Sequence, residues 1–263
     1  MELKRILSFV AAAGLVVTLS CGPDNSVTQN QISDATLFKI SSLGFSTQGA
    51  YRADDGYIVE GDIFLSEQDL ISLPGSPRLV IANVEQYNTF NLVTSLPRVI
   101  TVSGSGNVPA SVSSAIDGAI ARYNAENLGV TFQRVSSSGA INIKIVNGGS
   151  YIASSGFPSS SGDPYPTVKF NKQYASYSSG FLTTVIAHEI GHCIGFRHTD
   201  YMNRSFSCGS GGNEGQETTG IGAVHIPGTP TGPDAGSWML ACLSSTTNRP
   251  FNSNDKVALN YLY

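Results

Sequence analysis

The sequence predicts an α+β or α/β fold, a twisted mixed sheet with two long helices and a short helix at the C-terminus. The main observation is the order of periodic segments after residue 97, which runs strand, helix, strands, helix. That order is typical of helices layered on a mixed sheet. In addition, 41% of the 263 residues are hydrophobic, which is enough for the core of one ordinary domain with accessory segments.

The N-terminus has the pattern of an export signal. A positively charged start precedes an apolar run at residues 6–19, and small residues flank Cys21. This pattern resembles the lipobox of bacterial lipoproteins, whose cysteine is lipidated, although Thr18 stands where they usually have Leu. We therefore expect a signal peptide at residues 1–20 and a lipid-anchored protein of the bacterial cell envelope, or an extracellular one after processing. A plain signal peptide is the alternative.

Two accessory segments precede the main unit. Residues 21–34 are mostly polar and indicate a tether. Residues 35–96 have an apolar pattern of their own, but too little of it for a robust independent core. We expect a pro-segment there, which packs against the unit formed by residues 97–263.

Periodicity predicts the elements of that unit. Apolar residues at helical spacing predict a helix over residues 108–127, which Gly129 ends. A second long helix begins at Ser178 or Ser179 and ends at Gly195. Short apolar or alternating runs predict strands at residues 99–102, 130–132, 141–146, 151–155 and 167–170, and residues 254–263 predict the C-terminal helix.

Composition excludes some classes of partner. Only 13% of the residues are charged and the net charge is −4, against roughly 25% charged residues in an average domain. Without a basic face, the chain is not expected to bind nucleic acid. No second apolar run is long enough to cross a bilayer, so the lipid anchor is the only expected membrane contact. The oligomeric state is left open.

The stretch HEIGHCIGFRH points to specific chemistry. His188 and His192 are four residues apart, so on a helix they present their imidazoles to one place. Gly195 lets the chain leave the helix through a positive φ angle. The turn that follows returns His198 to the same place.

This set of side chains predicts a Zn²⁺ site. Three neutral imidazoles leave one tetrahedral position open, as in catalytic rather than structural zinc sites. Glu189, beside His188, is placed to act as general base and then as general acid. Three of the four histidines in the chain belong to the motif, which disfavours the alternative of histidines scattered in a packed helix. We predict His188, His192 and His198 as the ligands.

The motif resembles that of the metzincin clan of zinc peptidases. The clan also has a Met-turn, whose methionine forms an apolar floor beneath the three imidazoles, and Ser237-Trp238-Met239 has the Ser-x-Met form seen there. The resemblance implies this role for Met239, with an ordinary core methionine as the alternative. In the clan, substrate pairs by β-addition with an edge strand, a place that residues 151–155 occupy here.

Over about residues 97–263, HEIGHCIGFRHTD, the later MLAC and the final ALNYLY look like the HEIGH family of bacterial metallopeptidases, relatives of the astacins. Thr199 stands where astacins have Glu, and Ala241 where they have a metal-binding Tyr. A fifth ligand and the group that stabilises the oxyanion therefore stay open.

VEGDI, at residues 59–63, resembles the FxGD motif of astacin pro-segments, with Val59 in place of Phe. In that family the aspartate binds the zinc and displaces the catalytic water. The resemblance implies that Asp62 is a latency switch. The alternative is an ordinary turn, in which Gly-Asp pairs are common.

Some other residues leave alternatives. Asp200 is a candidate to orient a ligand histidine, whereas His225 is expected to be a solvated loop residue. Trp238 belongs either to the core or to the wall of the S1′ pocket. In an oxidising compartment, three cysteines permit one internal disulfide with the pairing left open: Cys193, Cys208 and Cys242.

Together these features predict an exported zinc endopeptidase that hydrolyses protein or peptide substrates and is made as a lipid-anchored zymogen. The alternative is a non-catalytic lipoprotein that uses the same fold to bind peptide or glycan, because fold alone does not fix function. Retention of Glu189 and of all three histidines disfavours it.

Overall fold

The computed structural model describes residues 32–53, 55–71, 86–213, 221–230 and 232–263. Residues from Gln31 onward form one compact unit. The predicted signal peptide, Cys21 and most of the predicted tether lie outside the described residues. None of the described helices is long and apolar enough to span a membrane.

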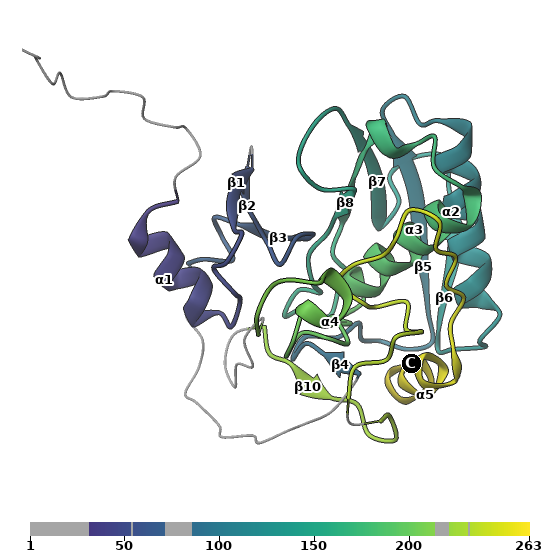
Figure 1. Cartoon of the computed structure of the whole chain (residues 1–263). Coiled ribbons are helices and arrows are strands. Elements are labelled where there is room, and N and C mark those ends of the chain that lie inside the picture. Colours follow the sequence, from purple (N-terminus) through teal and green to yellow (C-terminus); the bar gives the residue numbers. More distant parts are fainter. Residues whose placement is uncertain (1–31, 54, 72–85, 214–220, 231) are drawn as a thin grey trace, which may run out of the picture. The chain divides into compact units, whose positions relative to one another are not determined.

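A five-stranded sheet in the order β6-β5-β7-β9-β8 forms the centre of the molecule (Figure 1). Its strands are β5 (Arg98–Ser105), β6 (Val130–Arg134), β7 (Ile141–Val146), β8 (Ala153–Ser154) and β9 (Thr167–Asn171). The pairs β5·β6, β5·β7 and β7·β9 are parallel, whereas β8 is an antiparallel edge strand. The mixed sheet that the sequence predicts is confirmed, although β5 is longer and β8 shorter than expected.

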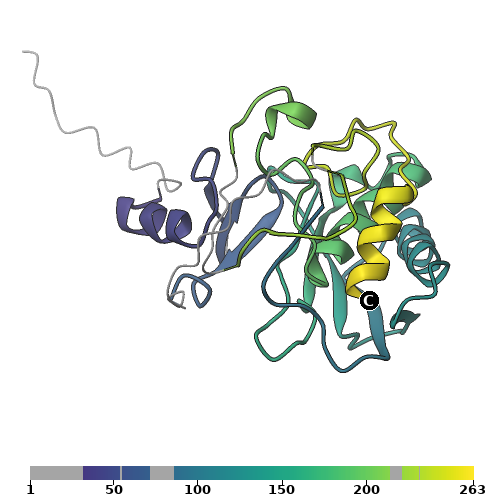
Figure 2. The ribbon, with the colours of Figure 1, turned by 90° about the horizontal axis from the view of Figure 1, so that it is seen from below.

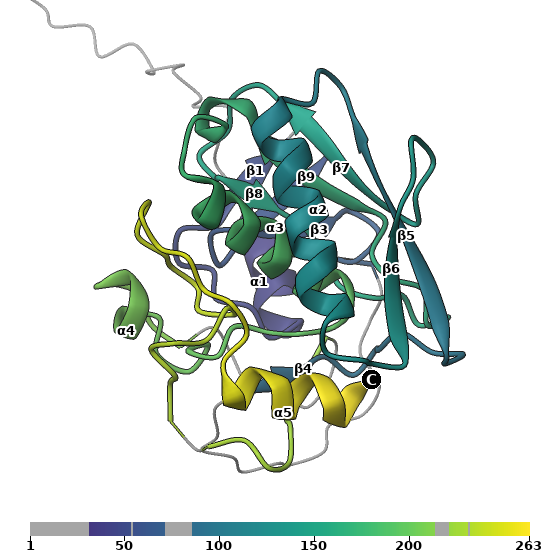
Figure 3. The ribbon, with the colours of Figure 1, turned by 90° about the vertical axis from the view of Figure 1, so that its right-hand side faces the viewer.

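Two long helices, α2 (Ala110–Asn124) and α3 (Ser179–Cys193), lie side by side against the sheet (Figure 3). α2 begins two residues later than predicted, with Pro109 as its N-cap. Its buried residues are those of the predicted apolar face: Val112, Ala115, Ile116, Ala119, Ile120 and Tyr123. The two helices are joined by a hydrogen bond of 2.8 Å from the Tyr123 hydroxyl to the carbonyl of Ala187.

α3 is capped at its N-terminus by Ser178, whose hydroxyl accepts a hydrogen bond from the amide of Phe181. Every residue from Phe181 to Cys193 is buried. A helix that is covered on all sides can hold polar side chains away from bulk water, which is how α3 carries the candidate site.

The C-terminal helix α5 (Ser253–Leu262) has a capping box made by Asn252 and Asp255. It buries Ala258 and Leu259 in the main core. Shorter elements complete this part of the chain: β4 (Tyr87–Asn88), the 3₁₀ turn η1 (Lys172–Tyr174), α4 (Ser205–Cys208) and β10 (Val224–His225).

The segment predicted as a pro-segment contains the helix α1 (Asp34–Ser42) and an antiparallel sheet of β1 (Tyr51–Ala53), β2 (Gly56–Val59) and β3 (Ile63–Ser66). In Figures 1 and 2 these elements lie beyond the β8 edge of the main sheet, at the other end of the molecule from α5. They share a small core of their own, against which Phe157 and Ile221 of the main unit pack. β3 also continues the main sheet beyond β8, because the amide of Phe64 donates to the carbonyl of Ser155 at 2.7 Å.

Candidate metal centre

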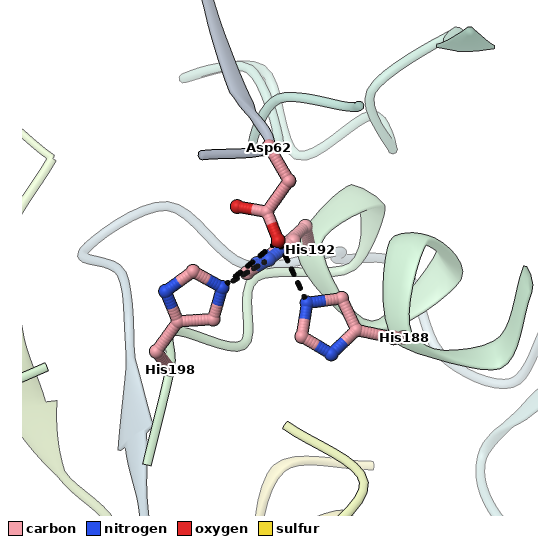
Figure 4. A group of neighbouring side chains, drawn as sticks. All are labelled: Asp62, His188, His192 and His198. Atoms are coloured by element: carbon pink, nitrogen blue, oxygen red, sulfur yellow. Dashed lines mark hydrogen bonds and ion pairs between the residues drawn. The ribbon is translucent and has the colours of Figure 1, made fainter. Parts of the chain in front are cut away.

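Four side chains from distant parts of the sequence converge at one point (Figure 4). Asp62 comes from the turn between β2 and β3, His188 and His192 from α3, and His198 from the segment after α3. One ligand atom from each lies within 4.8 Å of the others. The three predicted histidines are therefore brought together, and the aspartate of the VEGDI stretch joins them.

The chain reaches this arrangement through the turn at Gly195. Its φ angle is 110°, a conformation that L side chains rarely adopt. A Cβ atom at this position would also lie 2.7 Å from Cδ2 of Leu92 and 3.1 Å from the carbonyl oxygen of Asn91. Glycine is thus needed here for both conformation and space, and the reversal it permits carries His198 back to α3.

Two of the imidazoles are oriented by main-chain carbonyls. Nδ1 of His188 lies 2.8 Å from the carbonyl oxygen of Trp238, and Nδ1 of His192 lies 2.7 Å from that of Phe196. A carbonyl can only accept, so each Nδ1 carries the proton and each Nε2 keeps a free lone pair. Contacts of this kind orient ligand histidines in metal sites.

The spacing of the ligand atoms fits a tetrahedral ion. Nε2 of His192 lies 3.2 Å from Nε2 of His198. Oδ2 of Asp62 lies 3.3 Å from Nε2 of His198 and 3.4 Å from Nε2 of His188. Two ligands about 2.05 Å from one tetrahedral zinc ion are roughly 3.4 Å apart. In addition, Nε2 of His188 is buried without a hydrogen-bond partner in the described part of the chain, which a metal bond would satisfy.

The electrostatics of Asp62 also fit a cationic centre. Burial alone would raise the pKa of this carboxyl, but its electrostatic interactions with the neighbouring His198 and His188 hold that pKa well below the usual value. Asp62 is therefore ionised where it contacts the imidazoles. Its other oxygen, Oδ1, is buried without a hydrogen-bond partner among the described residues.

Glu189 lies beside the ligands and is almost fully buried, with 2% of its surface exposed. Its Oε2 accepts a hydrogen bond of 2.6 Å from the hydroxyl of Ser155. Burial, together with the nearby charge of Asp62, raises the pKa of the Glu189 carboxyl well above its usual value. Sequence reasoning did not single out Ser155, because one serine after a two-residue strand carries no motif.

Met239 is fully buried and packs against α3. A Cβ atom at Gly191 would lie only 2.6 Å from Sδ of Met239. The glycine of the HEIGH stretch therefore makes room for the methionine against α3. The amide of Thr199 donates to the carbonyl of Met239 at 2.9 Å, which ties this turn to the segment that carries His198.

The structure corrects one expectation and decides others. Asp200 does not orient a histidine: its carboxylate accepts from the hydroxyl of Ser207 at 2.5 Å and from the amide of Ala241 at 3.0 Å. Through these two contacts Asp200 instead ties the segment after His198 to the segment after the Met-turn. Trp238 lies in the core between Phe196 and Phe251.

The remaining residues of the prediction lie away from the ligand atoms. Cys208 and Cys242 form a disulfide, and Cys193 is a buried free thiol. His225 contacts the hydroxyl of Thr229 at 3.0 Å and is not among the metal-ligand candidates.

A cavity of about 190 Å³ opens beside the metal centre. It extends from Asp62 and Glu189 along α3 to the segment after the Met-turn. Apolar side chains form most of this wall: Phe181, Val185, Leu240 and Leu243. The cavity is therefore suited to an apolar side chain next to the ligand atoms.

Comparisons with known proteins give a family and a set of similar structures. The model of a family described as dual-action HEIGH metallo-peptidases matches residues 58–263. No curated protein matches the sequence.

Similar solved structures include two of myroilysin, both 18% identical to this chain. One has a TM-score of 0.44 and covers 66% of this chain and 96% of its own; the other has 0.40 and covers 69% and 95%. A third is high choriolytic enzyme 1, a hatching-enzyme zinc-protease from Oryzias latipes (medaka fish). It has a TM-score of 0.40 and 16% identity, over 62% of this chain and 88% of its own.

Proposed function

Because the chain belongs to the family of dual-action HEIGH metallo-peptidases, and so is a zinc metallopeptidase acting on proteins or peptides, we propose that it is an exported endopeptidase made as a lipid-anchored zymogen. The observation that carries the proposal is the convergence of three Nε2 atoms on one point, with a buried carboxylate, Glu189, beside them. His188, His192 and His198 hold the metal ion.

The chemistry that zinc supplies when bound is Lewis acidity toward the scissile carbonyl and toward a water molecule. Glu189 takes a proton from that water. Its Oε2 is held by Ser155, so Oε1 is the atom that accepts the proton and then delivers it to the leaving amine. Burial of Glu189 keeps this proton from exchanging with bulk water.

The apolar cavity determines where the substrate binds. A side chain of the substrate enters between α3 and the segment after the Met-turn, while the main chain pairs with the edge strand β8. Pairing of the substrate main chain with β8 does not require a free terminus of the substrate. We therefore expect endopeptidase rather than exopeptidase activity.

In the zymogen, the turn between β2 and β3 blocks both the metal ligands and the edge strand β8. Asp62 occupies the position at the ligand atoms where the substrate carbonyl and water would bind. The amide of Ser155 donates to the carbonyl of Asp62 at 3.1 Å, and Ile63 forms a parallel bridge with Ser155. The edge of the sheet is therefore occupied by residues 62–64, and activation requires that this hairpin leave. Cleavage between residues 79 and 97 would also free the catalytic unit from its anchor.

Export and lipidation rest on residues 1–21 alone. The expected anchor is the acylated Cys21, and its replacement by serine is expected to move the protein from the membrane fraction of the producing bacterium to the soluble fraction. Persistence of Cys21→Ser in the membrane fraction would contradict lipid anchoring.

The experiment that tests the enzymatic proposal is substitution of Glu189 by alanine, in the intact chain and in one that also carries Asp62→Ala. We expect the Glu189 variant to keep one zinc ion per chain and to lose casein hydrolysis by at least about a thousandfold. Glu67→Ala, at a half-exposed ion pair with Arg52, is the control. Casein hydrolysis that survives either Glu189→Ala or removal of zinc by a chelator would refute the proposal.

A further inference from the structure

Arg197, which directly precedes the ligand His198, is a fully buried cation next to the metal centre. Its guanidinium donates to the carbonyl of Gly222 at 3.0 Å and lies 4.9 Å from the ring centre of Phe45. Its Nε is buried without a hydrogen-bond acceptor in the described part of the chain. An arginine stays charged at any physiological pH, so this site requires a carboxylate or similar anion.

The carboxylate that fills it belongs to Glu60. The two oxygens of Glu60 lie 3.1 Å and 3.3 Å from Nη2 of Arg197, and both side chains are fully buried. Among the described residues, it is the carboxylate within ion-pair distance of Arg197. Glu60 is on the hairpin that carries Asp62, only two residues away. The hairpin tip thus inserts two carboxylates, one at the metal ligands and one at Arg197.

The Glu60–Arg197 pair differs from the ion pair that the turn between β1 and β2 makes with the main unit. Lys169 binds Asp55 at 2.5 Å, but the Asp55 side chain is 64% exposed, so water can replace it at small cost. Arg197 has no such solvent access. Removal of one partner from a buried pair leaves an uncompensated charge, which is strongly unfavourable.

The departure of the hairpin during activation therefore creates an anion-binding position beside the metal centre. When the rest of the predicted pro-segment leaves with the hairpin, Phe45 is removed as well as Glu60. Gly222, Tyr201 and Phe157 then remain around the guanidinium. Phe157 packs against the ligand His192 at 5.4 Å between ring centres. A bound peptide at the metal thus passes within reach of Arg197.

We propose that Arg197 is a specificity-determining residue that binds an acidic side chain of the substrate within two residues of the scissile bond. The short distance to the bond follows from Phe157, which lies 5.9 Å from the guanidinium of Arg197 and packs against the ligand His192. This inference rests on the proposed peptidase function, whose site it deepens by naming the substrate class.

The geometry also assigns the side of the scissile bond. Residues 150–153 line the apolar cavity, whereas Phe157, which follows Ser155 in the chain, lies 5.9 Å from the guanidinium of Arg197. A substrate that pairs antiparallel to this strand places its N-terminal side against the later residues. The acidic side chain therefore lies N-terminal to the scissile bond.

The test uses the full-length chain with Asp62→Ala and Glu60→Gln. These substitutions remove the hairpin's carboxylates from the metal ligands and from Arg197. Quenched fluorescent peptides that differ only by Glu, Gln or Lys are compared at each of the two positions before the bond and the two after it. We expect kcat/KM to be at least about tenfold higher for Glu than for Gln at one of the two positions before the bond, as for a charge-assisted hydrogen bond. Lys there should be cleaved most slowly.

The variants then assign this preference to Arg197. Arg197→Gln should abolish it, and Arg197→Lys should keep only part, because lysine cannot form the bidentate contact. Lys169→Gln is the matched control and should leave the preference unchanged. Equal cleavage of the Glu and Gln peptides by the chain that retains Arg197 would overturn the inference, and this result does not depend on whether the Arg197 variants fold. A preference for Glu that survives Arg197→Gln would also overturn it. Failure of a zinc-loaded chain to cleave any peptide would instead overturn the proposed function.

Discussion

The hydroxyl of Ser155 donates a hydrogen bond of 2.6 Å to Oε2 of Glu189, and it lies 3.1 Å from the main-chain carbonyl of the same residue. Both side chains are buried. The end of the edge strand and α3 are thus joined at Glu189, the proposed general base. Ser155 is a positioning residue, because it fixes one carboxylate oxygen and leaves the other for the reaction.

Substitution of Ser155 by alanine should lower kcat about tenfold to a hundredfold, with KM and zinc content nearly unchanged, since a positioning contact acts mainly in the transition state. The measurement is steady-state kinetics on a peptide substrate in the Asp62→Ala background. Ser155→Thr keeps the hydroxyl and should restore part of the activity. The neighbouring Ser154→Ala is the control, because the buried Ser154 hydroxyl has no hydrogen-bond partner among the described residues. An equal loss in both alanine variants would show a general effect on the strand.

Substitution of Asp62 by alanine should raise the peptidase activity of the uncut, full-length chain by at least about tenfold, because a carboxylate no longer competes for the metal centre. Activity is measured while gel electrophoresis confirms that the chain stays intact. Asp55→Ala removes the ion pair between Lys169 and the turn that joins β1 to β2, in which the Asp55 side chain is 64% exposed, and should leave latency unchanged. An intact wild-type chain that is already as active as the Asp62 variant would argue against a latency switch.

The disulfide between Cys208 and Cys242 closes a loop with a sequence separation of 34. In the chain-entropy model a loop of this size contributes about 2–4 kcal/mol to the free energy of unfolding. We expect the double serine variant to lose about that amount in urea denaturation.

Because burial raises the pKa of the Cys193 thiol well above its usual value, a thiol reagent should modify Cys193 only after unfolding. Rapid modification of the folded chain would contradict its burial.

The stability of the fold should depend on pH through Asp255. Burial raises the pKa of Asp255 to about 7, although the side chain of Gln86 and the amide of Asn252 donate to its carboxyl. The unfolded chain releases this proton near pH 4, so the folded chain binds more protons between about pH 4 and pH 7. The free energy of unfolding should therefore fall as pH rises through this window. Asp255→Asn should flatten the slope, and an unchanged slope would contradict the assignment.

The sequence predicted those parts of the site that local periodicity determines. His188 and His192 are one helical turn apart, and Gly195 has the positive φ that the turn requires. The apolar face of α2 was also predictable, because each of its buried residues follows helical spacing.

The parts that could not be predicted depend on contacts between distant segments. Ser155 reaches Glu189 across 34 positions, and Glu60 reaches Arg197 across 137. No local pattern encodes such pairs, since each partner alone is an ordinary polar residue. Asp200 was assigned incorrectly for the same reason: its nearness to His198 in sequence did not reveal that Ser207 and the amide of Ala241 are its partners.

Three imidazoles from α3 and the following turn are expected to hold a zinc ion. X-ray absorption at the zinc edge of the purified full-length chain measures the number and kind of these ligands. We predict one zinc ion per chain with four nitrogen or oxygen ligands at about 2.0–2.1 Å, three of them imidazoles. A sulfur ligand at about 2.3 Å, or fewer than three imidazoles, would contradict the account.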